Sequence, residues 1–313
     1  MYVKTGQPIN PDYKPFFKFP QSPFMNPSGS KALDLYNRGQ INDTDVEIMK
    51  FVYDNKIVTL DQIQRFLPDM HINQIQDIIR KLFQNHFLNA FMLGDGNPEK
   101  RYQPDAMQFY VLDFSAPALL FHLTNDEDML NWSATNNYMR AGKVIKVIAM
   151  TDFYLLMHQK LKNSPLAYNC YRIFSSGKTR VNPKVELIMD DQGKRKNFLF
   201  DVVDENDIFL GDKNKLNEKL LRYETMYNSD AWAKYYECDK DPELTPVLVI
   251  VCDTLNTAGQ VNKMLMDTEI PNYRLTTLKL AQTGLETCLM KYSKERQGLV
   301  RIKNKLFEEK ANN

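Results

Sequence analysis

The chain has 313 residues, and its 40 Lys and Arg residues nearly balance its 39 Asp and Glu residues, which gives a formal net charge of +1 at pH 7. This length is enough for two domains, each with its own core. A net charge so close to zero excludes the overall electrostatic signature of a nucleic-acid or anionic-membrane binder, so any contact with DNA must come from a local patch.

The cysteines, the histidines and the apolar stretches indicate which metal sites and membrane segments the sequence lacks. The four cysteines form no CxxC pair and the four histidines show no paired-ligand spacing, so we assign none of them to a metal. No apolar stretch approaches the length of a membrane span, and the first residues lack the continuous apolar core of a signal peptide. We therefore expect a cytoplasmic protein with no membrane contact.

Residues 1–42 are expected to form a flexible arm. Prolines at positions 8, 11, 15, 20, 23 and 27 disfavour a regular helix. Aromatic residues such as Tyr13 and Phe16 are interspersed among them, which indicates that the arm lies across a surface of this chain or of a partner.

Residues 43–123 predict three helices followed by a β-hairpin. The first helix would begin at Asp43 or Thr44, either of which could act as its N-cap. Thr59 would cap a second, short helix that Pro68 ends. The stretch INQIQDIIRKLF then places apolar residues at three- and four-residue spacing, which is typical of an amphipathic third helix. The apolar run FLNAFML, a loop with Gly and Pro, and the run FYVL complete the hairpin.

This order is typical of a winged helix-turn-helix, in which the third helix enters the major groove of DNA. On the outward face of that helix and on the wing, the candidate DNA-binding residues are Asn73, Gln74, Arg80, Lys81, Gln84, Lys100 and Arg101. Their side chains suit base edges and phosphates. Two alternatives stay open: polar residues face water on every amphipathic helix, and many winged helices bind proteins. Asp77, on the same face, would repel phosphate.

Residues 124–140 are polar and predict a linker, and residues 141–313 predict an α/β domain. A long helix begins this domain, and three strands follow at 168–174, 184–190 and 197–203. A helix over 213–228 leads to the apolar run at 246–253, which we expect to be a central, parallel strand. A further helix, a further strand and a basic C-terminal helix complete the domain.

A three-strand meander followed by a helical crossover to a buried parallel strand is the order of a restriction-endonuclease-like core. Nucleases of this fold hold a divalent metal between carboxylates on adjacent strands and use a lysine to orient water. Glu186 and Asp201 are the carboxylate candidates in this chain. Lys184 stands where an acid is expected after Pro183, and Val203 stands where the lysine is expected, so the site is predicted to be degenerate.

Some nucleases take the lysine from the following helix, where Lys215 and Lys219 are available. Glu186, Asp201 and Lys219 are therefore weak catalytic candidates, and Mg²⁺ is expected as a cofactor only if they act as a nuclease. Otherwise the two carboxylates are relics of a site or strand-end residues in solvent or in salt bridges. The sequence contains no phosphate-binding glycine loop and no nucleophile elbow.

In both halves the chain resembles the replication-relaxation family of plasmid and mobile-element proteins from low-GC Gram-positive bacteria. The resemblance covers about residues 43–280 and rests on LDQIQRFL, INQIQDIIRKLFQNHFL, YVLDFSAPALL, VIKVIAMTDFYLLM, NPKVELIMDD, NFLFDVVDEN, NKLNEKLLRY and PVLVIVCDT. It implies a winged helix joined to a nuclease-like α/β domain, and a role in plasmid replication, relaxation or transfer. The family pattern usually has acids where this sequence has Lys184 and Val203, which further weakens the expectation of catalysis.

We therefore expect a multi-domain α/β protein that binds double-stranded DNA as an accessory factor in plasmid replication or conjugative DNA processing, without catalytic activity. A relaxase or a replication protein would be its protein partner, and a homodimer is left open. Two alternatives are kept: a metal-dependent nuclease or nickase, and a winged-helix interaction module or transcriptional regulator. The near-neutral charge favours the interaction module over DNA binding.

Overall fold

The computed structural model divides into two compact units, residues 1–151 and 152–313, and each is described by itself. The structure describes residues 14–17, 29–94, 107–127, 129, 132, 133, 137, 139, 141–171, 173–176, 179–209, 213–236 and 244–310. The division falls inside α6 (Ala141–Lys160), so the first turns of this helix belong to the first unit, whereas we expected the second domain to begin at residue 141. Within the described ranges, no helix is long and apolar enough to cross a bilayer.

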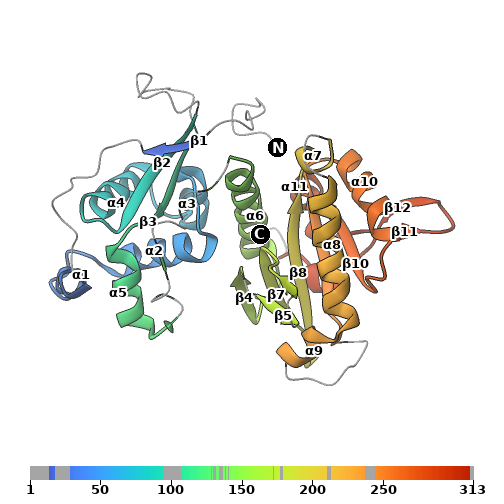
Figure 1. Ribbon diagram of the computed structural model, residues 1–313. Helices are drawn as coiled ribbons and strands as arrows, with labels where there is room; N and C mark the ends of the chain where they lie inside the picture. The colour runs from blue at the N-terminus through green and yellow to red at the C-terminus, as the bar shows by residue number, and fades with distance from the viewer. Residues whose placement is uncertain are drawn as a thin grey trace. The chain divides into compact units, whose positions relative to one another are not determined.

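The helices described in the first unit, in blue to green in Figure 1, are α1 (Gly29–Asn37), α2 (Asp43–Asn55), α3 (Leu60–Phe66), α4 (Ile72–Gln84) and α5 (Ser115–Thr124). Of these, α2, α3 and α4 are the three helices that were expected after residue 42. Thr59 caps α3 as expected. The cap of α2 is Asn42 rather than Asp43 or Thr44, because the Asn42 side chain accepts the Asp45 N–H at 3.0 Å and Asp45 accepts the Asn42 N–H in return.

A three-stranded antiparallel sheet completes the first unit, in the order β1-β2-β3. Its strands are β1 (Lys14–Phe17), β2 (Leu88–Gly94) and β3 (Met107–Leu112), and the last two form the expected hairpin. Between α2 and α3 the chain also touches this sheet, since Val58 and Tyr110 form an antiparallel bridge with N–H···O distances of 3.1 and 2.7 Å. Helices and sheet share one core, in which Ile63, Ile79 and Phe109 are buried.

The first 42 residues contain more regular structure than the flexible arm that we expected. Strand β1 pairs with β2, with Phe17 opposite Phe91. Helix α1 begins after Pro27, the last proline of this segment, so the prolines do not interrupt it. Ala32 of α1 is fully buried, and α1 packs against α5. Tertiary contact therefore stabilises a helix that composition alone did not reveal; the rest of the expected arm, 1–13 and 18–28, lies outside the described residues.

A mixed seven-stranded sheet forms the centre of the second unit, in the order β12-β11-β10-β9-β8-β7-β4. Its strands are β4 (Ala167–Cys170), β7 (Val185–Asp191), β8 (Lys194–Val203), β9 (Val247–Cys252), β10 (Tyr273–Thr277), β11 (Met290–Ser293) and β12 (Gly298–Arg301). Strand β9 is parallel to β8 and β10, and the other neighbours are antiparallel. Strand β9 is buried along its whole length, which confirms the central, parallel strand. The fold is mixed α/β.

The strand expected over 168–174 is split in two. Strand β4 joins the main sheet, whereas β5 (Phe174–Ser176) pairs with β6 (Thr179–Val181) in a separate two-stranded sheet. Tyr171, between them, has a φ of 57°, a backbone conformation that turns the chain out of the extended path. The separate strand pair brings residues 179–182 toward α8 (Lys213–Asn228), which β6 contacts.

Helices cover both faces of the main sheet. Helix α8 lies beside β8 in Figure 1, and it buries Leu216, Leu220, Tyr223 and Tyr227. On the other face, Phe153 of α6 packs against Phe200 of β8, with ring centroids 5.2 Å apart. Successive β8 residues point to opposite faces, so the residue after Phe200 points toward α8. The remaining helices are α7 (Glu205–Phe209), α9 (Ala231–Tyr235), α10 (Leu255–Met266) and α11 (Leu278–Thr283).

The C-terminal segment forms strands where we expected a basic helix. Strands β11 and β12 make an antiparallel hairpin, and β11 pairs with β10 through Met290 opposite Leu275. Gln297, with a φ of 48°, lies in the turn that reverses the chain. A short 3-10 turn at Lys305–Phe307 then buries Phe307 completely. Pairing with the free edge of β10 decides the structure here, because helical propensity is only a weak preference that tertiary contacts override.

Candidate functional site

Asp201 lies on the face of the main sheet that α8 covers. The Lys184 N–H donates to the Phe200 carbonyl at 2.8 Å, and Val185 is paired with Phe200. The antiparallel register therefore continues with Lys184 opposite Asp201. A lysine thus lies beside this carboxylate at the position where a nuclease of the expected kind would carry a second acid.

Hydrogen-bond donors surround the Asp201 carboxylate, which is 1% exposed. Lys219 Nζ lies 2.5 Å from Oδ2, the Tyr223 hydroxyl donates to the same oxygen at 2.9 Å, and the Val202 N–H donates to Oδ1 at 2.8 Å. Burial alone would raise the pKa of Asp201, but the charges of Lys219 and Lys184, together with the hydrogen bonds, outweigh it and hold the pKa below its usual value. Asp201 is therefore ionised at neutral pH.

The spacing of α8 explains why two of its side chains reach Asp201. Lys215, Lys219 and Tyr223 follow one another at intervals of four residues, so they form one row along the helix. Burial and the negative charge of Asp201 raise the pKa of Tyr223 well above its usual value, so this hydroxyl remains a donor. The structure thus brings Asp201 together with Lys219, the helix lysine that was a weak catalytic candidate.

Glu186 lies on the same face of the sheet but in a different hydrogen-bond network. It is opposite Leu199 in the register of β7 and β8. Its Oε2 accepts from the Asn169 side chain at 2.8 Å, and its Oε1 accepts from the Tyr236 hydroxyl. Burial and the charge of Glu186 raise the pKa of Tyr236 far above its usual value, so this hydroxyl also remains a donor. Glu186 is thereby anchored to β4 and to the residue after α9, whereas Asp201 is anchored to α8.

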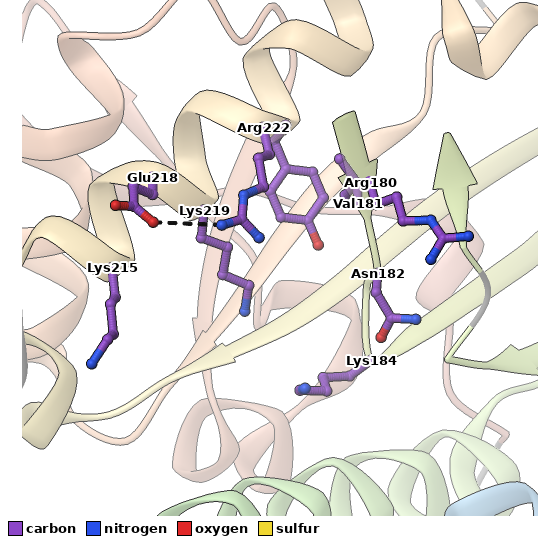
Figure 2. A pocket seen from close by; sticks show the side chains of 9 residues that line it. Arg180, Val181, Asn182, Lys184, Lys215, Glu218, Lys219 and Arg222 are labelled. Atoms are coloured by element: carbon purple, nitrogen blue, oxygen red, sulfur yellow. Dashed lines mark hydrogen bonds and ion pairs between the residues drawn. The ribbon is translucent and has the colours of Figure 1, made fainter. Parts of the chain in front are cut away.

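A pocket of about 480 Å³ lies between α8 and the segment that joins β6 to β7 (Figure 2). It is lined by Arg180, Val181, Asn182, Lys184, Lys215, Glu218, Lys219, Arg222 and Tyr223. Five of these side chains are cationic at neutral pH, and one is a carboxylate. That carboxylate, Glu218, lies 3.5 Å from the Arg222 guanidinium, and both side chains are exposed. The pocket above Asp201 is therefore basic.

The sequence identified only part of this site. Lys219 and Asp201 were candidates, but Arg180, Asn182 and Tyr223 were not. The four-residue spacing of α8 could have indicated Tyr223, since Tyr223 follows Lys219 by one turn. No sequence signal links β6 to α8, because only the tertiary fold brings these two elements into contact. Across the described part of the chain, no group of three or more His, Cys, Asp and Glu side chains is arranged to hold a metal ion.

Helix α4 of the first unit turns a polar face outward, as expected. Four of the candidate DNA-binding residues are exposed on it: Asn73, Gln74, Arg80 and Gln84. Gln74 also accepts the His71 N–H at 3.1 Å in the cap of the helix. Arg80 forms an ion pair with Asp77, one turn away, at 2.8 Å. The opposite face of α4 is buried through Ile75, Ile79 and Leu82, which fixes the polar face toward solvent.

Lys81 differs from the four exposed candidates. Its Nζ lies 2.5 Å from Oδ2 of Asp45, a carboxylate of α2 that is fully buried. This ion pair ties α4 to α2, so Lys81 serves the packing of the first unit rather than standing out on the polar face. The two wing candidates, Lys100 and Arg101, lie outside the described residues.

Comparison with known proteins gives no family for this chain. No protein-family model matches it, and no curated protein matches it. Among solved structures, the restriction endonuclease FokI is similar at 15% identity and a TM-score of 0.28, over 77% of this chain and 43% of FokI. FokI bound to DNA is similar at 13% identity and a TM-score of 0.26, over 77% of this chain and 44% of FokI. The chain thus spans less than half of the proteins it matches, and neither similarity, at a TM-score below 0.5, assigns it a fold or an activity.

Proposed function

We propose that the chain is a DNA-binding accessory protein of a plasmid or conjugative element, and that it acts in replication or DNA transfer without cutting DNA. The observation that carries this proposal is the exposed polar face of α4, which lies opposite the residues that α4 buries. Asn, Gln and Arg side chains on an exposed helix match the donors and acceptors that base pairs present in the major groove.

The order of the first unit supports the assignment of a winged helix-turn-helix. Helix α2, the Val58 bridge, α3, α4 and the β2–β3 hairpin follow one another along the chain. In winged helices the helix at the position of α4 is the recognition helix, and the hairpin forms the wing. The proposed base contacts are Asn73, Gln74, Arg80 and Gln84.

The element order of the second unit supports a restriction-endonuclease-like domain. The surroundings of Asp201, however, do not suit a bound metal ion. The meander β4, β7 and β8, the crossover through α8, and the parallel strand β9 follow the order expected of that fold. Asp201 Oδ2 already accepts from Lys219 and Tyr223, and Lys184 brings a further positive charge. Val203, at the expected lysine position, is a buried apolar residue. A divalent cation prefers several oxygen ligands, whereas both oxygens of the nearby Glu186 accept hydrogen bonds from Asn169 and Tyr236, so the residues present do not fit a Mg²⁺ ion.

The genetic setting of the proposal comes from the resemblance to the replication-relaxation family. It covers both units of the chain, and its motifs include the sequence of α4 and the strand that carries Asp201. The proposed partners are therefore double-stranded DNA and a relaxase or replication protein of the same element. Because the chain resembles this family, we propose a cellular role in replication or transfer rather than in gene regulation.

Fluorescence anisotropy with duplex DNA from the element that encodes the chain tests DNA binding. At low salt, where phosphate contacts are strongest, the full chain should bind, and Asn73→Ala/Arg80→Ala should weaken binding at least about tenfold, since each good base contact is worth about 1–3 kcal/mol. Arg296→Ala, an exposed arginine of the second unit, is the matched control and should bind normally. No binding at low salt would sink the proposal and favour a protein-interaction module.

A cleavage assay tests the absence of catalysis. Supercoiled plasmid incubated with the chain and Mg²⁺ or Mn²⁺ should remain intact. Cleavage that disappears in Asp201→Ala would overturn this part of the proposal and establish a nuclease. Cleavage that persists in Asp201→Ala would identify a contaminant and leave the proposal standing.

A further inference from the structure

The pocket over Asp201 holds more positive than negative charge. Five cationic side chains line it, and the opposing carboxylates are Glu218 at its rim and Asp201 beneath it. Like charges gathered at one site repel one another. A negatively charged ligand in the pocket would relieve this repulsion.

The cations approach the pocket from two sides. Lys215, Lys219 and Arg222 come from α8, whereas Arg180 lies in the middle of β6 and Lys184 immediately precedes β7. Figure 2 shows the ends of the Lys184 and Lys219 side chains directed into the same space, from the strand side and from the helix side. A ligand between them would therefore meet donors from opposite directions.

Asp201 positions the Lys219 ammonium beside the pocket. Its carboxylate holds Lys219 at 2.5 Å from below, while Lys219 is still 35% exposed. A fixed ammonium loses less conformational freedom on binding a ligand than a free lysine does. The carboxylate that would hold a metal in a nuclease therefore serves here to orient a cation toward the pocket.

We propose that this pocket binds a phosphomonoester carried by a nucleotide or by the end of a nucleic-acid strand. A phosphomonoester carries about 1.5 to 2 negative charges at neutral pH and presents acceptor oxygens in several directions, which suits cations that converge from two sides better than a planar carboxylate does. The pocket volume of about 480 Å³ falls in the range of about 300–1,000 Å³ of small-molecule sites. It exceeds a bare phosphate and leaves room for the attached sugar. This site is independent of the proposed α4 surface.

The test uses the full chain and two pairs of probes. Isothermal titration calorimetry compares thymidine 5′-monophosphate with thymidine, and fluorescence anisotropy compares a single-stranded hexanucleotide with and without a 5′-phosphate. The phosphorylated member of at least one pair should bind at least about tenfold more tightly than its partner. Equal affinity within both pairs, or no binding of any phosphorylated probe at millimolar concentration, would overturn the proposal.

Variants at exposed positions test whether the phosphorylated probe binds in the pocket, because such substitutions usually change the stability of the fold little. Arg180→Ala/Lys215→Ala removes two exposed lining cations and should weaken binding of the phosphorylated probe at least about tenfold. Lys263→Ala/Arg296→Ala removes the same charges from exposed positions that do not line the pocket and should have no effect. An equal loss in both variants would mean general electrostatic attraction and would also overturn the proposal.

The two sources of the phosphate are separated by the same titrations. A strand-end site predicts that the phosphorylated hexanucleotide binds at least about tenfold more tightly than the mononucleotide, whereas a nucleotide site predicts similar affinities. Asn73→Ala/Arg80→Ala should leave binding of the mononucleotide unchanged. The experiments thereby distinguish a failure of the proposed duplex binding through α4 from a failure of the proposed phosphate binding in this pocket.

Discussion

Lys219 and Asp201 form an ion pair in which Nζ lies 2.5 Å from Oδ2, and the carboxylate is 1% exposed while the lysine is 35% exposed. The pair joins α8 to the sheet at Asp201, one of the two carboxylates that the sequence offered as metal-ligand candidates. Because Tyr223 donates to the same oxygen, the carboxylate is satisfied by the chain itself. The pair, together with the charge of Lys184, holds the pKa of Asp201 below its usual value.

Removing the lysine of this pair should destabilise the second unit. Lys219→Met leaves Asp201 buried without its ion partner, and we expect a loss of about 2 kcal/mol of unfolding free energy, less than for a fully buried pair because the lysine is partly screened by solvent. Urea unfolding followed by the fluorescence of the buried Trp232, in a Trp132→Phe background, measures it.

The double variant Asp201→Asn/Lys219→Met is the control for that measurement. It removes both charges, so it should lose less stability than the sum of the two single variants. Additive losses would show that the pair contributes no coupling energy and would contradict the role given to Asp201.

The stability that Asp201 contributes should depend on pH. The folded state holds the pKa of Asp201 below its usual value of about 4, so the unfolded chain binds more protons once the pH falls toward that value. Stability from this group is therefore fully present at neutral pH and is lost below about pH 4, as the pH approaches the lower pKa of the folded state. The difference in unfolding free energy between the wild-type chain and Asp201→Asn should shrink from pH 7 to pH 3. A difference that is constant or grows over this range would refute the assignment.

Asp77 should weaken DNA binding through α4. It pairs with Arg80 at 2.8 Å, and its charge repels phosphate. Asp77→Asn should therefore strengthen duplex binding severalfold and steepen its dependence on salt by about one released counterion. Anisotropy titrations at several salt concentrations measure both effects. Glu295→Gln, which removes an exposed carboxylate in the turn between β11 and β12, should change neither; weaker binding by Asp77→Asn would argue against α4 as the contact surface.

The C-terminal segment should be part of the core of the second unit. Phe307 is fully buried, and its ring centroid lies 5.2 Å from that of Phe198 in β8. Phe307→Ala should cost about 3–5 kcal/mol of unfolding free energy, as large-to-small changes in a core do. Lys305→Ala, an exposed neighbour, should cost less than about 0.5 kcal/mol. Similar small effects of both changes in urea unfolding would mean that the segment does not pack on the sheet.

Where local periodicity was strong, the sequence predicted the elements correctly. Helix α4 followed from apolar residues at three- and four-residue spacing, and β9 followed from an unbroken apolar run. The segment after Gly284 was predicted wrongly, because its charged residues have good helical propensity and no local signal indicates the free edge of β10. The helix α1 was missed for a related reason: its stability depends on packing against α5.

The sequence by itself determined that Asp201 lies near the end of a buried strand, that Val203 cannot act as a lysine, and that a lysine-bearing helix follows. Those conclusions depend only on residue type and short-range spacing. Only the tertiary structure decided which partner Asp201 takes, because the register of β7 places Lys184 opposite it and the packing of α8 brings Lys219 to its oxygen. The basic pocket likewise exists only once β6 and α8 meet, since a cluster of charges from distant segments is produced by folding and leaves no pattern in the chain.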